Sequence, residues 1–257
     1  MGVEVQFSKH TIGPKAEAQA QALQPGQVML LENLRFYDEE TKGDEQFANA
    51  LSTLADCYIN DAFGTAHRAH ASTTIVAQFF PKAKHFGYLL AQEIDAIDRV
   101  MTTGEKPVLA VLGGAKVSSK ITIIENILDK VDHLIIGGGM SFTFAKAMGG
   151  QIGNSICEDD KQELALSILR SAKEKGVQIH LPTDVVAGDR FSNEANQQIF
   201  PIEHIPDGWE GMDAGPESVL AFREVVLQSK TILWNGPLGV FEFSHFSQGT
   251  IALGKAI

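Results

Sequence analysis

The feature that most restricts the fold of this chain is the stretch VLAVLGGAKVSSKI at residues 108–121. Its first five residues are apolar, which is typical of a buried strand, and that strand ends at two glycines beginning with Gly113. We expect a helix to begin near Ser118, with Lys116 and Lys120 four residues apart. Glycine N–H groups, a helix N-terminus and two lysines would suit a phosphate group. An ordinary strand-to-helix turn with two solvated lysines is the alternative, because short glycine motifs recur by chance.

Composition limits the classes of protein and ligand that need to be considered. The 257 residues are 44% hydrophobic and 21% charged, which is ordinary for one large or two modest globular domains. The net charge of −11 argues against a nucleic-acid partner, so an anionic ligand would be held by local positive groups. Cys57 and Cys157 predict neither a disulfide framework nor a metal site. With no signal peptide and no apolar run of about 18 residues, we expect a cytoplasmic protein without a membrane partner.

The N-terminal third alternates short apolar runs with helical patterns. A predicted strand at 28–31 leads directly to Arg35, and one at 57–60 leads into the loop DAFGTAHRAH at 61–70. That loop carries three basic side chains in four positions, which are His67, Arg68 and His70. A solvated loop would be the simpler interpretation, but a second arginine at the same sheet edge favours an anion site. Zinc is disfavoured because no third ligand stands at a recognisable spacing.

A change of pattern near residue 100 predicts a domain boundary. Apolar residues recur at helical spacing over 87–101, and the breaker cluster TTGEKP follows at 102–107. We therefore predict a partial domain at 1–86, an interdomain helix and linker at 87–106, and a second partial domain at 107–257. A core-facing surface helix is the alternative interpretation of the apolar stripe.

The second block alternates strands and helices, which predicts a parallel sheet covered on both faces. Strands are expected at 108–112, 132–136, 178–181 and 231–234, and helices at 118–128, 142–148, 159–175 and 216–228. Ligands of such sheets bind beyond the carboxyl ends of the strands. The segments expected there are 113–120, 137–140, 181–184 and 235–242. The block has no Walker loop, and Phe142 replaces the third glycine of a dinucleotide fingerprint, which disfavours a nicotinamide-dependent oxidoreductase.

Six segments occur in the order and spacing of the phosphoglycerate kinase family, and the resemblance covers essentially the whole chain. They are LLENLRF (30–36), DAFGTAHRAH (61–70), LGGAKVSSKI (112–121), IGGGM (136–140), MDAGPES (212–218) and WNGPLGVFE (234–242). The resemblance implies an α/β fold with two parallel-sheet, Rossmann-like domains joined by an interdomain helix. It also implies a glycolytic phosphotransferase. The reaction would be reversible phosphoryl transfer between 1,3-bisphosphoglycerate and ADP, giving 3-phosphoglycerate and ATP, with Mg²⁺ on the nucleotide.

The resemblance also assigns residues to two sites. Arg35 and Arg68 would bind the glycerate substrate, with Gly64 and His67 shaping the loop. Lys116 and Lys120 would be the catalytic lysines, in contact with the nucleotide and the transferring phosphoryl group. The other nucleotide-binding residues would be Gly113, Gly137, Gly138, Gly211, Asn235, Gly236, Leu238, Phe241 and Glu242, with Glu242 accepting hydrogen bonds from the ribose.

The chain lacks several motifs of that family. The family's Asp-x-Asn motif, an arginine that supports the transferring phosphoryl group and a His-x-Gly-Arg-Pro loop would stand before residue 1 and are not in this chain. The Gly-Gly-Asp turn that holds the Mg²⁺-nucleotide would lie past Ile257. We therefore expect an internal fragment with both domains incomplete, monomeric, without a metal ligand of its own, and inactive alone. A nucleotide-binding fragment or interaction module without turnover is the alternative.

Overall fold

The computed structural model describes residues 2–257, which divide into two units, Met1–Ile97 (unit 1) and Asp98–Ile257 (unit 2). The boundary between them falls in the last turn of helix α4 (Tyr88–Asp98). This helix lies within the stretch predicted as a connector, and the domain limits given above stay a prediction. Within residues 2–257 no helix is both long enough and apolar enough to cross a membrane.

Unit 2 is built on a parallel sheet in the order β13-β5-β6-β8. Its strands are β5 (Val108–Leu112), β6 (His133–Ile136), β8 (Gln178–His180) and β13 (Thr231–Asn235). All five residues of β5 are buried, because helices cover both faces of the sheet. The predicted parallel α/β class is confirmed here.

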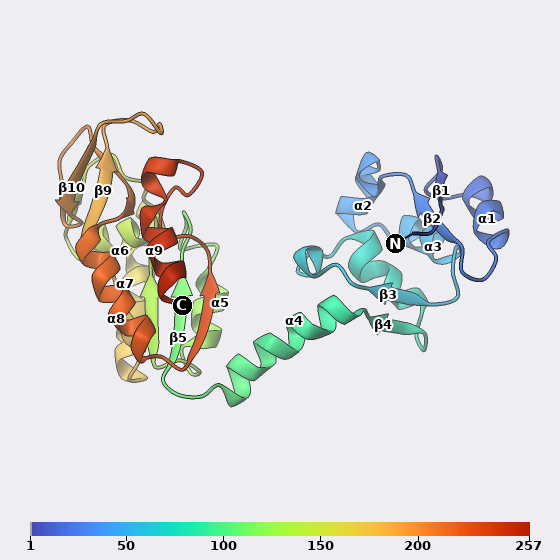
Figure 1. Cartoon of the computed structure of the whole chain (residues 1–257), viewed down its shortest axis with the longest axis horizontal. Helices are drawn as coiled ribbons and strands as arrows, with labels where there is room; N and C mark the ends of the chain where they lie inside the picture. Colours follow the sequence, from blue (N-terminus) through green and yellow to red (C-terminus); the bar gives the residue numbers. More distant parts are fainter. Residues whose placement is uncertain (1) are drawn as a thin grey trace. The chain divides into compact units, whose positions relative to one another are not determined.

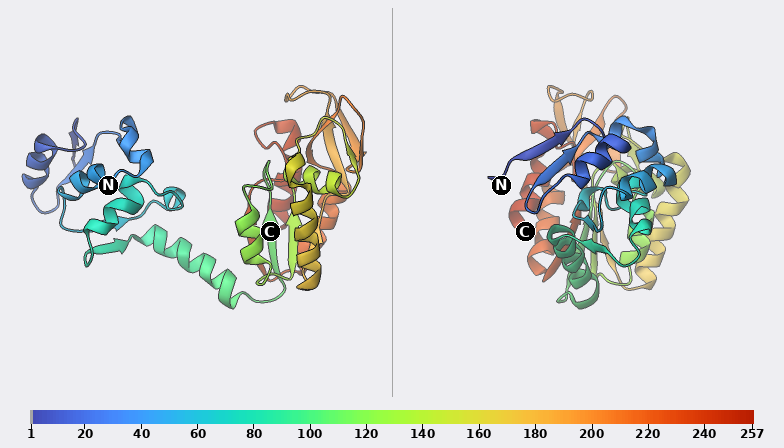
Figure 2. Two further views of the ribbon diagram at one scale, coloured as in Figure 1. Left: turned by 180° about the vertical axis from the view of Figure 1, so that it is seen from behind. Right: turned by 90° about the vertical axis from the view of Figure 1, so that its right-hand side faces the viewer.

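The two faces of β5 pack against different helices, as Figures 1 and 2 show. Leu109 and Val111 form one cluster with α8 (Pro216–Gln228) and α9 (Gln248–Ala256). The alternate residues of β5 contact the helices on the opposite face, which are α5 (Ile121–Ile127), α6 (Met140–Ala147) and α7 (Gln162–Glu174). This period-two division of side chains fixes the sheet between two helical layers.

A smaller antiparallel sheet in unit 2 was not among the predicted elements. It has the order β10-β9-β12, with β9 (Asp184–Gly188), β10 (Gln197–Pro201) and β12 (Glu210–Ala214). A short parallel pair, β7 (Gln151–Ile152) and β11 (His204–Ile205), lies in the same unit. These strands escape prediction because they carry polar residues and glycines, and β12 is bulged between Gly211 and Asp213.

Unit 1 contains two separate two-stranded parallel sheets. β1 (Val5–Ser8) pairs with β2 (Val28–Leu31), and β3 (Tyr58–Asn60) pairs with β4 (Lys84–Phe86). Helices α1 (Pro14–Gln21), α2 (Asp38–Lys42) and α3 (Glu45–Ser52) accompany them. A small cluster centred on Phe47 and Phe80 forms the core of this unit.

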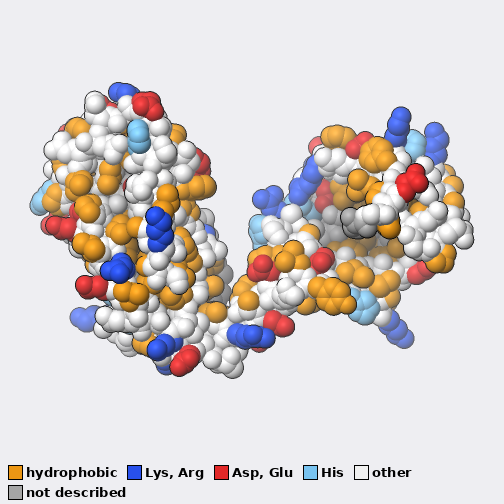
Figure 3. Space-filling view, in the orientation of Figure 1, with side chains coloured by type: hydrophobic (Ala, Val, Ile, Leu, Met, Phe, Trp, Pro, Cys, Tyr) orange, Lys and Arg blue, Asp and Glu red, His pale blue; other side chains and the backbone are white. Residues whose placement is uncertain are grey.

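Several strand residues of unit 1 are apolar and exposed, and apolar side chains are spread over its visible face in Figure 3. Phe7 and Leu30 are register partners on β1 and β2, and they are 52% and 58% exposed. Phe86 at the end of β4 is 65% exposed. Because parallel sheets are normally covered on both faces, unit 1 has a much weaker core than unit 2.

Candidate functional site

Three segments approach one another very closely at the carboxyl edge of the unit 2 sheet. Gly113, Gly137 and Gly236 directly follow β5, β6 and β13. The N–H of Gly113 donates to the carbonyl of Asn235 at 2.9 Å. A Cβ at Gly113 would clash with the carbonyl of Pro237, and one at Gly137 would clash with the side chain of Leu238. Backbone packing therefore requires glycine at 113, before any ligand is considered, while Gly137 makes room for the Leu238 side chain.

A cavity of about 410 Å³ opens beside these segments. Five predicted nucleotide residues line it, namely Gly138, Gly211, Leu238, Phe241 and Glu242. The other predicted residues of this set do not line it, although Gly113 and Gly137 pack directly behind its wall. Sequence reasoning missed the lining residues Phe142, Ile156, Phe191, Met212, Asp213 and Val240. In the sequence, Phe142 stands only in place of the third glycine of a dinucleotide fingerprint, which gives no sign that its ring lines a cavity.

The two predicted catalytic lysines lie on the turn that follows β5. The Lys120 ammonium donates to the side-chain oxygen of Asn235, so two predicted residues from distant segments meet. Lys120 immediately precedes α5, which begins at Ile121 rather than near Ser118. Neither lysine lines the cavity.

A carboxylate occupies the turn that was predicted to face a phosphate. The N–H of Ser118 donates to Glu158 Oε2 at 3.0 Å, and the Ser118 hydroxyl donates to the other oxygen. Burial raises the pKa of Glu158, but the Ser118 hydrogen bonds and the charge of Lys116 outweigh burial and leave this pKa below its usual range. Glu158 thus satisfies a donor of the turn, and an anionic ligand would have to use other donors here.

Asp213 on β12 is a buried carboxylate in the wall of this cavity, with 3% of its surface exposed. Its Oδ1 accepts from the N–H of Ala214 at 2.9 Å, and its Oδ2 accepts from Gly249 in the first turn of α9 at 2.8 Å. Burial raises the pKa of Asp213 to about 6, although backbone N–H groups oppose that rise. The MDAGPES segment was the only sequence signal for this residue.

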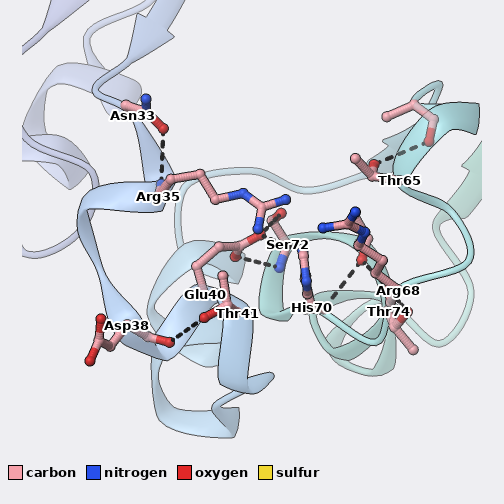
Figure 4. Close-up of polar contacts among 12 residues, drawn as sticks. Asn33, Arg35, Asp38, Glu40, Thr41, Thr65, Arg68, His70, Ser72 and Thr74 are labelled. Carbon is pink, nitrogen blue, oxygen red and sulfur yellow. Dashed lines mark hydrogen bonds and ion pairs between the residues drawn. The ribbon is translucent and has the colours of Figure 1, made fainter. Parts of the chain in front are cut away.

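Unit 1 brings the two predicted arginines together. Arg35 lies in the 3₁₀ turn Leu34–Phe36 after β2, where the Asn33 side chain accepts its N–H at 2.9 Å. Figure 4 shows the guanidinium groups of Arg35 and Arg68 pointing toward one another near the buried Glu40. Among residues 2–257, neither arginine has an acidic side chain within ion-pair distance. Two exposed, uncompensated guanidinium groups that converge in this way suit an oxyanion.

The remaining predicted residues of unit 1 lie beside this pair. His67 accepts from Arg68 Nε at 3.3 Å, while a Cβ at Gly64 would meet no atom within 4 Å. A cavity of about 330 Å³ is lined by Arg35, Asn60, Thr65 and Ser72, among others. The loop and the strand end therefore meet as predicted, and the roles of the individual residues stay predictions.

The described residues contain no preformed cluster of metal-binding side chains. No group of three or more His, Cys, Asp and Glu side chains gathers anywhere in residues 2–257. The described residues therefore hold no preformed cage of protein ligands, whereas Mg²⁺ carried by a nucleotide usually needs only one or two carboxylates beside phosphate oxygens and water.

A parallel α/β unit with a glycine-walled cavity, together with a second parallel-sheet unit that presents paired arginines, defines a two-unit α/β protein. The family model "Phosphoglycerate kinase" matches residues 1–257, and the chain belongs to that family. The predicted family and the two-unit α/β fold are confirmed.

The relatives support the same family. A phosphoglycerate kinase of Porphyromonas gingivalis is 50% identical, with 100% of this chain and 67% of the relative covered. The cytosolic phosphoglycerate kinase of Nicotiana tabacum is 49% identical, with 100% of this chain and 64% of the relative covered. A relative from Volvox carteri is named as chloroplastic. The chain spans about half to two thirds of the length of these curated relatives.

Solved phosphoglycerate kinase structures match the fold. The Coxiella burnetii structure has a TM-score of 0.78 and 43% identity, and covers 91% of this chain and 60% of its own. The Pyrococcus horikoshii OT3 structure has a TM-score of 0.82 and 28% identity, and covers 98% of this chain and 65% of its own.

Proposed function

We propose that unit 2 binds ADP or ATP, that unit 1 binds 3-phosphoglycerate or 1,3-bisphosphoglycerate, and that both serve phosphoryl transfer between these ligands. The observation that carries this proposal is the convergence of Arg35 and Arg68, two exposed guanidinium groups without acidic partners. Bidentate arginine contacts suit the phosphate and carboxylate of a glycerate ligand. Family membership supplies the reaction class, a phosphotransferase with a carboxyl group as acceptor.

The nucleotide would occupy the cavity of unit 2. Phe142, Phe191 and Phe241 give this cavity apolar surface for a base, and Glu242 can accept hydrogen bonds from ribose hydroxyls. Lys116 and Lys120 would contact phosphate oxygens after Lys120 exchanges its contact with Asn235 for a ligand. Phosphoryl transfer needs little covalent work from the protein, so the placement of positive groups would supply most of the catalysis.

Magnesium would enter with the nucleotide, where it would neutralise phosphate charge. The described residues provide no ligand set for it. We infer that this 257-residue chain, which spans about half to two thirds of the length of its curated relatives, binds nucleotide weakly and does not turn over alone. The exposed apolar strands of unit 1, including Phe7 and Leu30, support the same conclusion, because a poorly covered sheet holds its loops less firmly. We also propose that the chain is monomeric and cytoplasmic.

The test combines two measurements on the purified chain. Calorimetric titration should detect ADP and 3-phosphoglycerate binding separately, and a coupled assay should detect no ATP formation from 1,3-bisphosphoglycerate and MgADP. Turnover within about tenfold of a full-length relative would show that our account of the mechanism is wrong. Absence of binding for both ligands would refute the proposed function, whereas ADP binding without 3-phosphoglycerate binding would favour a nucleotide-binding module.

A further inference from the structure

Helix α2 is only five residues long, yet it carries a buried carboxylate. Glu40 is 2% exposed, while the neighbouring Asp38 and Glu39 on the same helix are exposed. Burying an ionised carboxylate is costly unless hydrogen bonds or a positive group compensate it. The compensation for Glu40 comes from the loop that also carries Arg68.

Two residues of that loop contact the Glu40 carboxylate. Ser72 donates its N–H to Oε2 at 3.0 Å and its hydroxyl to Oε1 at 2.6 Å. The Nδ1 atom of His70 lies 3.9 Å from Oε1, is fully buried, and has no hydrogen-bond partner among the described residues. Figure 4 shows the His70 ring beside Glu40 and Ser72. This separation is longer than a hydrogen bond, and a proton on Nδ1 is the tautomer that avoids placing a nitrogen lone pair against the carboxylate.

Further hydrogen bonds hold the residues after Ser72 to the backbone of Arg68, and another holds Ser72 itself. The hydroxyls of Thr73 and Thr74 donate to the carbonyl of Arg68 at 2.8 and 3.2 Å. The Tyr58 hydroxyl donates to the carbonyl of Ser72 at 2.9 Å. The Glu40 contact therefore acts on a segment whose next two residues hold the backbone of Arg68.

The end of α2 also packs directly on this loop. Gly43, which ends α2 in the left-handed region with φ 66°, lies so close to Ala69 that a Cβ would sit 2.5 Å from its carbonyl oxygen. Helix α2 thus contacts the segment 69–72 through both its backbone and the Glu40 side chain.

We propose that Glu40 is a positioning residue of the glycerate site. Its carboxylate fixes the protonated nitrogen of His70 and the backbone of Ser72, and so keeps the Arg68 guanidinium directed at Arg35. This inference rests on the proposed function, because the affected ligand is 3-phosphoglycerate. Its effect is confined to unit 1, since all of its contacts lie in that unit.

The test compares Glu40→Gln with Glu39→Gln, a matched change at the adjacent exposed position of the same helix. Glutamine keeps the size of the side chain but removes its charge. Its single side-chain oxygen cannot accept both hydrogen bonds from Ser72 in the way that the two carboxylate oxygens do, and the neutral amide attracts His70 less strongly. We expect Glu40→Gln to raise the Kd for 3-phosphoglycerate about tenfold, as for loss of a hydrogen bond to a charged group. The Kd for ADP should stay unchanged, and Glu39→Gln should change neither value.

A spectroscopic measurement separates positioning from general stabilisation. In ¹⁵N NMR spectra of the full chain, the His70 ring should show a protonated Nδ1, and Glu40→Gln should shift that signal while Glu39→Gln should not. A folded Glu40→Gln chain with unchanged His70 signals and unchanged 3-phosphoglycerate affinity would overturn the proposal.

If Glu40→Gln does not fold, Ser72→Ala provides the second test. Ser72→Ala removes only the hydroxyl hydrogen bond, and we expect it to raise the same Kd about two- to fivefold. An unchanged Kd in folded Ser72→Ala would refute the role. If the unmodified chain bound no 3-phosphoglycerate, the proposed function would fail instead, and the His70 signals would still test the Glu40 contact.

Discussion

Both units present positive groups next to strand ends, but they hold these groups in different ways. In unit 2, β5 is buried on both faces, and the close approach of Gly113 to the Pro237 backbone and of Gly137 to the Leu238 side chain shapes the cavity. In unit 1, strand residues such as Phe7 are exposed, and side-chain hydrogen bonds centred on Glu40 hold the arginine loop. The comparison indicates that a covered sheet can form a site from its backbone, whereas a poorly covered sheet depends on a few polar contacts.

The largest expected effect is on the free energy of unfolding, and it tests whether the core of unit 2 is better packed than that of unit 1. Phe144→Ala removes a fully buried side chain of unit 2 and should lower the free energy of unfolding by about 3–5 kcal/mol. Phe7→Ala in unit 1, where the side chain is 52% exposed, should cost less than about 1 kcal/mol. Urea titration followed by tryptophan fluorescence reports unit 2, since Trp209 and Trp234 both lie there, and hydrogen exchange reports unit 1. Equal costs would contradict the comparison.

The next largest effect concerns the lysines of unit 2. In an active chain that carries these residues, Lys120→Ala should lower kcat by about 10²–10³, as when one preorganised donor to a transition state is lost. Lys130→Ala, at an exposed position of the same unit, is the control and should leave kcat unchanged. Steady-state kinetics with 1,3-bisphosphoglycerate and MgADP measures both. A near-normal kcat for Lys120→Ala would exclude the proposed role.

A smaller effect is expected from the arginines of unit 1. Arg35→Ala and Arg68→Ala should each raise the Kd for 3-phosphoglycerate about tenfold or more, because each removes charge-assisted hydrogen bonds. Their Kd for ADP should not change. Lysine at either position should restore affinity only in part, since lysine cannot make the bidentate contact. Calorimetric titration measures both Kd values, with Lys82→Ala, at an exposed position of the same unit, as the control. Wild-type affinity in both alanine variants would remove the pair from the site.

The smallest expected effect is a pH dependence specific to unit 2. The pKa of Asp213 is about 6 in the folded chain, against an ordinary value of 3.8. Because the folded state binds this proton more tightly, the stabilisation is complete below about pH 3.8 and is lost as the pH rises through about 6. Between pH 7 and pH 5 the group should add about 1 kcal/mol to the stability of unit 2.

Asp213→Asn should remove that contribution. Tryptophan-detected unfolding at several pH values would measure it, with Asp207→Asn at an exposed position of the same unit as the control. Identical pH dependence in the wild type and Asp213→Asn would contradict the assignment.

Local patterns predicted a large part of the fold. The apolar run of β5, the glycines after β5 and β6, and the alternation with helices gave the parallel sheet of unit 2 and the edge where its cavity lies. The convergence of Arg35 and Arg68 was also predictable, because both follow strands at the same type of edge. These features depend on residue periodicity and on the geometry of parallel strands, which a single sequence displays.

Other features could not be predicted, because they depend on which distant groups become buried together. The antiparallel sheet containing β9 and β12 has no strict alternation, so its strands resemble loops in sequence. No sequence motif marks Glu158, yet it satisfies the Ser118 N–H across forty positions of sequence. Nothing in the sequence distinguishes the buried Glu40 from the exposed Glu39 beside it.

The sequence by itself determined the family, the parallel α/β plan and the placement of glycines, lysines and arginines at strand ends. Only the tertiary structure decided what each of these groups contacts. Gly113 permits close approach to the backbone of Pro237, and Gly137 leaves room for the Leu238 side chain. The turn at Ser118 is satisfied by Glu158, and Glu40 holds the arginine loop. The physical reason is that desolvation depends on all neighbouring atoms at once. A carboxylate or an N–H group therefore finds its partner only when the whole unit is folded.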